Sequence, residues 1–377
     1  TAYFGCRDLA GNTGNTSTGV FNVNTTAPVI LTISPDGFVS TPANVTVTTN
    51  EQANCRYSST AINYSGMSNF GSTNGLTSHT VNLSAQFVQG LNVFYVACAD
   101  NSAGDNAMLG SVIVDFVYDT ERPAIAAVVP VNGSRVSNKT ISFSLRDTVS
   151  GVNLTNISVA VNLNASNNTF STASCGENGL GGYDCSFVAV NVSEGSNNFT
   201  VEARDNALNR LAHFVLFTYD STVPTVTVNA PASGSVQNTK SLLLNISTDE
   251  LGRCRYSRQN TVFGSMPDSM ANISTQHLAN VVSDEGSNTY YFACQDLALN
   301  EQASSTTFTV NTTAPVVTAS GPFGVQGVLA VNLTVTTDAQ ATCRYDSSDR
   351  NFSQLATQFT NTGNVEHNSS VIPTRQG

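Results

Sequence analysis

The stretch FNVNTTAPVI at residues 21–30 sets the organisation of this chain, because close variants of it return three more times. They read FVYDTERPAI at 116–125, FTYDSTVPTV at 217–226 and FTVNTTAPVV at 308–317. Each copy is a short β pattern followed by Asp or Asn, a polar pair and a proline. Proline cannot donate to a β ladder and keeps its predecessor extended, so each copy predicts a strand end followed by a stiff joint between domains.

A second phrase precedes every joint. It reads CRDLAGN at 6–12, CADNSAGDN at 98–106, ARDNALN at 203–209 and CQDLALN at 294–300. In each copy a strand pattern ends at an aspartate, namely Asp8, Asp100, Asp205 or Asp296. Because Asp, Asn and Gly favour Asx turns and left-handed backbone, the phrase predicts a hairpin turn between the last two strands of a domain. A cation site at this turn is the alternative interpretation.

A third phrase, ANCRYS at 53–58, recurs as GRCRYS at 252–257 and ATCRYD at 341–346, after an alternating strand such as NVTVTT at 44–49. Cutting the chain after the first Asn or Asp of each joint gives three complete repeats and two flanking pieces. The repeats are 25–119, 120–220 and 221–311, and the pieces are 1–24 and 312–377. Short alternating strands in blocks of about 100 residues predict a β-sandwich array. No segment has helical periodicity.

The Asp-x-Ala-Gly-Asn turn, followed by a strand and Asp/Asn-Thr-Thr-Ala-Pro, resembles the immunoglobulin-like repeats of large bacterial and archaeal surface proteins. The resemblance covers nearly the whole chain and implies an all-β fold of tandem immunoglobulin-like β-sandwich domains. That family includes adhesins, surface-layer proteins and filaments, so the fold does not select among these functions. Some relatives bind calcium between domains. Asn24 and Asn311 stand where the family often has Asp, which weakens any carry-over of that interdomain calcium to this chain.

The composition excludes several classes of protein. Hydrophobic residues make up 40% and charged residues 11%, which does not fit an acidic disordered chain. The net charge of −11 leaves no basic footprint for nucleic acid. Two lysines, Lys139 and Lys240, offer little to an anionic lipid surface. No apolar run reaches the roughly 18 residues of a membrane-spanning helix, so no membrane insertion is expected in this segment. The start at Thr1 without a signal peptide predicts a mature product or an excised piece.

The cysteines are predicted to form disulfides within domains. Cys55 pairs with Cys98, and Cys254 with Cys294, each pair joining the Cys-Arg-Tyr strand to the penultimate strand of its repeat. This placement favours bridges between neighbouring strands of one sheet, worth about 4 kcal/mol each in the chain-entropy model. The second repeat lacks that pair, and its Cys175 and Cys185 predict a local hairpin bridge worth about 2–3 kcal/mol. Disulfides at this density indicate an oxidising, extracellular compartment.

Two cysteines, Cys6 and Cys343, remain without a partner in their own pieces. Reading from Cys343 through Gly377 and on to Cys6 gives 40 residues, the same interval as from Cys254 to Cys294. One count differs, since Gly377 lies six residues before Cys6 across this seam, whereas Gly90 and Gly286 lie eight before their cysteines. We therefore expect 312–377 to be completed by residues 1–24 of a neighbouring copy. Separate subunits joined head to tail satisfy this arithmetic, and so does one longer polypeptide that repeats the unit.

Nineteen Asn-x-Ser/Thr sequons exceed the number expected by chance and predict N-linked glycans on an extracellular surface. They are Asn15, Asn24, Asn44, Asn63, Asn82, Asn132, Asn138, Asn153, Asn156, Asn164, Asn167, Asn191, Asn198, Asn245, Asn272, Asn311, Asn332, Asn351 and Asn368.

Signs of catalysis are missing from the sequence, and we predict that the chain is not an enzyme. No Gly-x-Ser-x-Gly elbow, Walker loop or dinucleotide fingerprint is present. Three of the four histidines recur at similar places in the repeats, which favours packing or capping over catalysis; the four are His79, His213, His277 and His367. Tyr57, Tyr256 and Tyr345, which follow each Cys-Arg step, favour core positions.

No cofactor is predicted, although interdomain calcium is possible where Asp119, Glu121 and Asp220 lie at the joints. Two lysines exclude an isopeptide bond in every domain. The leading hypothesis is a structural subunit or repeat segment of an extracellular filament or cell-surface coat. The alternative is the stalk of a cell-surface adhesin, and an enzyme-accessory domain ranks third.

Overall fold

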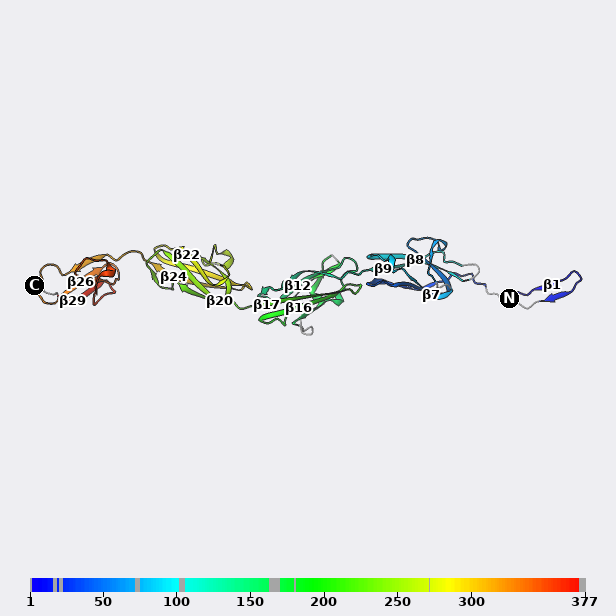
Figure 1. Ribbon diagram of the computed structural model, residues 1–377, viewed down its shortest axis with the longest axis horizontal. Helices are drawn as coiled ribbons and strands as arrows, with labels where there is room; N and C mark the ends of the chain where they lie inside the picture. The colour runs from blue at the N-terminus through cyan, green and yellow to red at the C-terminus, as the bar shows by residue number, and fades with distance from the viewer. Residues whose placement is uncertain are drawn as a thin grey trace. The chain divides into compact units, whose positions relative to one another are not determined.

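The computed structural model describes residues 2–15, 19, 23–71, 75–101, 106–162, 170–179, 181–270 and 272–372, with the backbone alone for residue 15. Within these ranges the chain consists of β-strands and short 3-10 turns and contains no α-helix, as predicted. None of the helical turns described is long or apolar enough to cross a membrane. The chain divides into two compact units, residues 1–222 with 297–299 and residues 223–296 with 300–377 (Figure 1).

Residues 120–220 form a sandwich of two four-stranded sheets. The first sheet has the order β10 (Ala124–Val129), β12 (Thr140–Arg146), β15 (Gly182–Val188) and β14 (Cys175–Glu177). The second has the order β11 (Arg135–Val136), β17 (Arg210–Tyr219), β16 (Gly195–Arg204) and β13 (Ser158–Val161). This partition of strands, with one core enclosed between the sheets, is that of an immunoglobulin-like domain.

Residues 25–119 have the same strand order with one change. Their strands are β3 (Ile30–Ser34), β4 (Gly37–Val39), β5 (Asn44–Ser58), β6 (Ser68–Asn69), β7 (Leu76–Asn82), β8 (Gly90–Asp100) and β9 (Val112–Tyr118). The sequence predicted separate strands at 44–49 and around Cys55, but β5 runs through both. It pairs with β3 and β7 in its first half and with β6 and β8 after a register shift between Thr48 and Ala53, so one strand serves both sheets.

Residues 221–311 repeat this arrangement. Their strands are β18 (Val226–Ala230), β19 (Val236–Gln237), β20 (Ser241–Ser257), β21 (Asp268–Ser269), β22 (Ser274–Val282), β23 (Gly286–Asp296) and β24 (Glu301–Val310). Every second residue of the first half of β20 is buried, which places Leu242, Leu244 and Ile246 in the core. The short strand β19 pairs in parallel with the last strand β24, as β4 does with β9.

The two flanking pieces are smaller. At the N-terminus, β1 (Gly5–Arg7) and β2 (Thr13–Asn15) form a hairpin. At the C-terminus, β25 (Val317–Gly321), β26 (Val331–Thr337) and β29 (Glu366–Val371) form one sheet, and β27 (Arg344–Tyr345) pairs with β28 (Thr357–Gln358). The 3-10 turns are η1 (Tyr64–Gly66), η2 (Ser84–Gln86), η3 (Leu154–Asn156), η5 (Thr172–Ser174), η6 (Phe263–Ser265) and η7 (Phe352–Gln354).

The disulfides follow the prediction. Cys55–Cys98, Cys175–Cys185 and Cys254–Cys294 are bridged, and each pair lies directly opposite on neighbouring antiparallel strands. Cys6 and Cys343 are free thiols, the first exposed and the second half-buried.

Candidate functional site

The aspartate turn that precedes each joint has one hydrogen-bonding pattern throughout. At Asp205, Oδ1 accepts from the Asn209 backbone N–H and Oδ2 from the Asn209 side-chain amide, both at 2.8 Å. Asp8 holds Asn12, Asp100 holds Asn106, and Asp296 holds Asn300 in the same two ways. These bonds confirm the predicted hairpin turn.

In the three turns where it is described, the residue just before the asparagine has left-handed backbone. Gly11 supplies it with φ 94°, but Leu208 and Leu299 take the same position with φ 69° and 71°. A residue with a Cβ is strained in this region, so the turn holds these two leucines against their own preference.

A second turn follows at every joint. The side chains of Asn24, Asp119, Asp220 and Asn311 each accept a hydrogen bond from the backbone N–H two residues later. The joint residue therefore caps the exit of the chain whether it is an acid or an amide.

Three buried carboxylates meet at the joint of residue 119. Asp119 and Asp205, both singled out in the sequence, lie with Asp147 so that one carboxylate oxygen of each is within 4.8 Å of the others. Their exposed fractions are 0%, 0% and 7%. The sequence analysis did not single out Asp147. This residue directly follows β12, whereas in the other two complete repeats the equivalent strands β5 and β20 continue past this point. The equivalent positions there are also acidic, Glu51 and Glu250. That recurrence was the available signal.

Each carboxylate of this cluster is held by neighbouring donors. Asp119 accepts from the Ser150 hydroxyl at 2.6 Å and from the Gln89 amide at 2.6 Å. Asp147 accepts three backbone N–H groups through Oδ1, from residues 149, 150 and 151. The Asn209 amide bridges from Asp205 to the backbone carbonyl of Asp119 at 2.8 Å. The cluster is thus fixed in place by the turn and the joint together.

Burial and mutual repulsion disfavour the charged form of Asp205 in this cluster. Burial raises the pKa of Asp205; the hydrogen bonds from Asn209 oppose that rise, and the charges of Asp119 and Asp147 add to it. Clustered carboxylate oxygens are the ligands that a hard divalent cation such as Ca²⁺ prefers. The arrangement can therefore either hold a cation or share a proton among its carboxylates.

The histidines and tyrosines are packing residues, as predicted. His79, His277 and His367 are almost fully buried at equivalent positions. The Nε2 of each lies 3.1–3.4 Å from the hydroxyl of a buried threonine: Thr49, Thr248 and Thr337. His213, on β17, is half-buried. The ring of Tyr57 packs edge-on against Phe70, and those of Tyr256 and Tyr345 contact Tyr290 and Phe359.

The sequons differ in exposure. The exposed asparagines are Asn24, Asn44, Asn63, Asn82, Asn132, Asn138, Asn156, Asn272, Asn311, Asn332 and Asn351. The half-buried ones are Asn153, Asn191, Asn198, Asn245 and Asn368. Asn164, Asn167 and the side chain of Asn15 lie outside the described residues. Eleven sequon asparagines of the described residues are therefore exposed, and among them the Asn24 side-chain amide already donates to the Glu51 carboxylate.

No protein-family model and no curated protein sequence matches the chain. Among solved structures, the fibronectin(III)-like modules of CbhA from Clostridium thermocellum match at 17% identity and a TM-score of 0.33, over 50% of this chain and 93% of that one. A tetra-tandem repeat from the extending region of a large adhesion protein matches at 16% and 0.26, over 88% and 87%. A three-domain immunoglobulin piece of titin matches at 7% and 0.33, over 76% and 99%. TM-scores this low carry no argument, so the fold rests on the strand topology above.

Proposed function

We propose that this chain is a structural segment of an extracellular filament or cell-surface coat. In this proposal, residues 312–377, here called the C-terminal unit, are completed by a hairpin of the β1–β2 kind from another copy, head to tail. The observation that carries the proposal is a correspondence: the strands of residues 312–377 match the first strands of the repeat 221–311, and the hairpin β1–β2 matches its last two strands.

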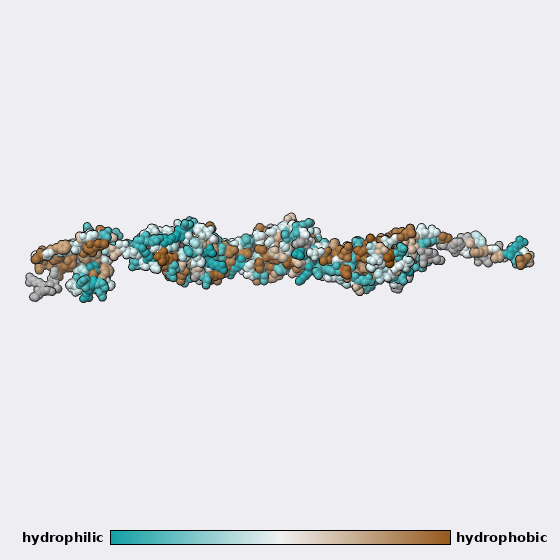
Figure 2. Space-filling view, turned by 90° about the horizontal axis from the view of Figure 1, so that it is seen from above, coloured by the Kyte–Doolittle hydropathy of each residue, from teal (hydrophilic) through white to brown (hydrophobic). Residues whose placement is uncertain are grey.

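The C-terminal unit retains only part of the plan of residues 221–311. Its strands β25, β26 and β29 correspond to β18, β20 and β22, and its Cys343 corresponds to Cys254. Among the described residues of this unit, no strand occupies the places of β23 and β24. Apolar side chains are exposed on the described part of residues 312–377, over which brown atoms gather in Figure 2. They include Val316, Val317, Phe323, Val325, Val328 and Leu329.

The N-terminal hairpin β1–β2 matches the last two strands of the complete repeat 221–311 in sequence. Tyr3-Phe4-Gly5-Cys6 corresponds to Tyr291-Phe292-Ala293-Cys294 at the same distance from the aspartate turn. Cys6 pairs across its hairpin with Gly14 as Cys294 pairs with Gln302. Phe292 is fully buried in the core, whereas Phe4 is 60% exposed.

Docking the hairpin on the unit would complete the set of strands found in the repeat 221–311. Burying a phenylalanine side chain contributes about 1.5–3 kcal/mol. The strand pairing would also satisfy two open sheet edges, which otherwise tend to pair with another chain. Cys6 would face Cys343 as Cys294 faces Cys254, so the contact would be locked by a disulfide. A contact of this heterologous kind does not close on itself and grows into a filament.

A cross-linking experiment tests the assembly. Oxidised wild-type chains should give a ladder of multimers on a non-reducing gel. Cys6→Ser and Cys343→Ser chains should each stay monomeric alone and give a single dimer band when mixed. Homodimers in either variant alone would mean unspecific thiol coupling, and a soluble wild-type monomer with two titratable thiols would overturn the proposal.

The same geometry also suits one long polypeptide that repeats this unit, as expected of an adhesin stalk. The mass of the native material after reduction distinguishes the two. Release of single 39.6 kDa chains, plus any glycan, indicates separate subunits. A mass that stays at multiples of this value indicates a stalk.

Glycosylation belongs to the same proposal. The eleven exposed sequons support N-linked glycans on an extracellular surface. Intact mass before and after enzymatic deglycosylation should differ by several glycans, and an unmodified native mass of 39.6 kDa would contradict this part of the proposal.

A further inference from the structure

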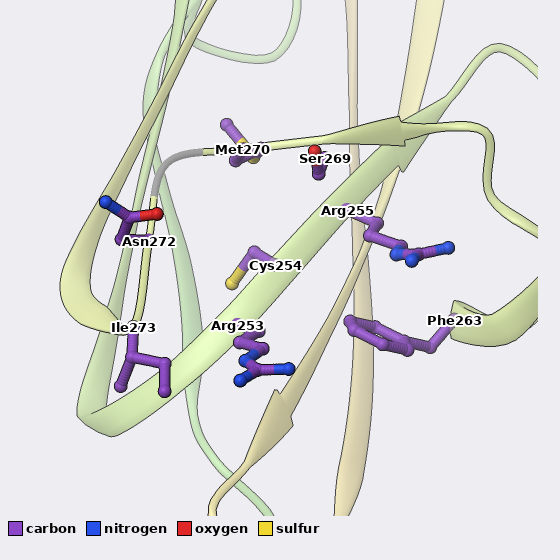
Figure 3. Close-up of a pocket in the computed structure, with 8 residues that line it drawn as sticks. All are labelled: Arg253, Cys254, Arg255, Phe263, Ser269, Met270, Asn272 and Ile273. Carbon is purple, nitrogen blue, oxygen red and sulfur yellow. The ribbon is translucent and has the colours of Figure 1, made fainter.

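A pocket of about 530 Å³ opens on the outer face of residues 221–311, beside the Cys254–Cys294 disulfide. Its lining includes Arg253, Arg255, Phe263, Ser269, Met270 and Ile273. Figure 3 shows both arginine side chains extending from β20 toward the side on which Phe263 lies. Two neighbouring cations in one pocket stand out in a chain of net charge −11.

Arg255 is held in place by contacts within the domain. Its guanidinium lies 5.1 Å from the centre of the Phe263 ring and donates to the Met266 carbonyl at 3.0 Å. The same pair recurs as Arg56 on Tyr64 and as Arg344 on Phe352, each with a donated bond to a backbone carbonyl. Arg255 therefore has a structural role that repeats, and it is held in position before any ligand arrives.

Arg253 is the exception to the repeat. The equivalent residues are Asn54 and Thr342. Asn54 is tied into its own domain, since its Oδ1 accepts from the Gly75 N–H at 3.0 Å. Arg253 is exposed, and no carboxylate of the described residues lies within ion-pair distance of it. An exposed cation with no ion pair among the described residues, next to a second cation that is held in place and an aromatic ring, is available to a ligand.

We propose that this pocket binds a carboxylated sugar. The Arg253 guanidinium offers a planar fork of N–H donors that matches a carboxylate in bidentate fashion. The free N–H groups of Arg255 lie on the same side of β20 and add a second positive charge. The Phe263 ring, whose one face is covered by the Arg255 guanidinium, also lines the pocket and adds apolar surface for the C–H groups of a sugar.

This inference does not depend on the assembly of the chain into filaments. The ligand has two sources: an acidic glycan on another molecule, or one attached to this chain at Asn272, which lies on the rim of the same pocket. Both present the same chemistry. They are separated by comparing native protein with enzymatically deglycosylated protein, because a glycan attached at the rim would block an added sugar.

The test is a titration of the full chain with D-glucuronate, followed in amide NMR spectra, with glucose as the neutral control. Glucuronate should shift resonances of residues 253–255, 263, 269, 270, 272 and 273 with a dissociation constant in the millimolar range. Glucose should not. Arg253→Asn, which installs the residue of the first repeat, should weaken binding about tenfold or more, because the bidentate contact is lost.

Arg253→Asn also serves as the control for folding. The Arg253 side chain is exposed and forms no ion pair within the described part of the chain, so Arg253→Asn should leave the rest of the spectrum and the thermal midpoint unchanged. Binding to native protein only after deglycosylation assigns the ligand to the chain's own glycan, and binding before it assigns an external one. Equal shifts with glucose, an unaffected Arg253→Asn variant, or no shift in either form of the protein would overturn the proposal.

Discussion

The joints at residues 24 and 119 share the same hydrogen bond to the backbone of the joint residue but differ in the charges around it. In both, the side-chain amide that closes the aspartate turn also donates to the carbonyl of the joint residue, Asn106 to Asn24 and Asn209 to Asp119, each at 2.8 Å. The positions around them correspond one by one. The first joint has Asn24, Glu51 and Asp100, where the second has Asp119, Asp147 and Asp205.

The difference is a single donor. At the first joint, the Asn24 amide donates to the Glu51 carboxylate at 3.0 Å, so one acid of the group is paired from within. At the second joint, the residue equivalent to Asn24 is Asp119, a third carboxylate. The hydrogen bonds to its side chain all come from donors outside the three acids, such as Ser150 and Gln89. An Asn-for-Asp exchange thus separates a joint that is complete as a protein structure from one with excess negative charge.

The largest expected effect is the loss of the Asp119 side chain. Asp119→Ala leaves the buried Ser150 hydroxyl and the Gln89 amide without their acceptor, which costs about 2–3 kcal/mol of local stability, partly offset by relief of repulsion. Asn24→Ala, the matched change at the exposed first joint, should cost under about 1 kcal/mol. Hydrogen exchange of peptides around each joint measures both. Equal losses would show that the two joints are held in the same way.

Charge removal without loss of shape should have the opposite sign. Asp147→Asn keeps the Oδ1 acceptor for its three backbone donors and replaces the other oxygen by an amide that can donate to Asp119 or Asp205. We expect it to stabilise the joint by about 1 kcal/mol in a metal chelator, since one of three clustered charges is gone.

Calcium determines how that result is interpreted. If added calcium protects the wild-type joint in hydrogen exchange and this protection disappears in Asp147→Asn, the cluster is a cation site. If calcium changes neither protein, the cluster is a set of repelling carboxylates that the turn holds together. A destabilised Asp147→Asn in chelator would contradict the electrostatic account.

The comparison also shows how far the sequence could be interpreted. The joints, the turns and the disulfides were predictable because each depends on local chemistry: a proline, an Asx turn, or a cysteine at a fixed place in the repeat. Asp147 was not predictable in that way. It reaches Asp119 and Asp205 only through the packing of three segments, and it stands in a loop where the other two complete repeats have a continuous strand. The pocket at Arg253 was not predictable from the repeat, because the equivalent residues are Asn54 and Thr342 and the position therefore has no recurring chemistry.

A pH dependence should separate the joints with a smaller effect. Because the pKa of Asp205 is raised in the folded chain, the folded joint holds that proton more tightly than the unfolded chain does. Local stability is therefore gained as pH falls through the folded pKa toward the ordinary value of 3.8, and lost as pH rises through it. Hydrogen exchange corrected for the intrinsic rate should show this at the second joint. Asp147→Asn should reduce it, because one of the charges that raise the pKa is absent.

The smallest effect is expected from the matched change at the first joint, Glu51→Gln. Glu51 is only half-buried, and the Asn24 amide can donate to a glutamine carbonyl as it does to the carboxylate. Exchanging a partly exposed charged hydrogen bond for a neutral one should change local stability by less than about 0.5 kcal/mol. The change should be the same with calcium and with chelator. A gain as large as that of Asp147→Asn would mean that the Asn24 donor does not neutralise its joint, and the distinction between the two joints would then rest on burial rather than on the amide.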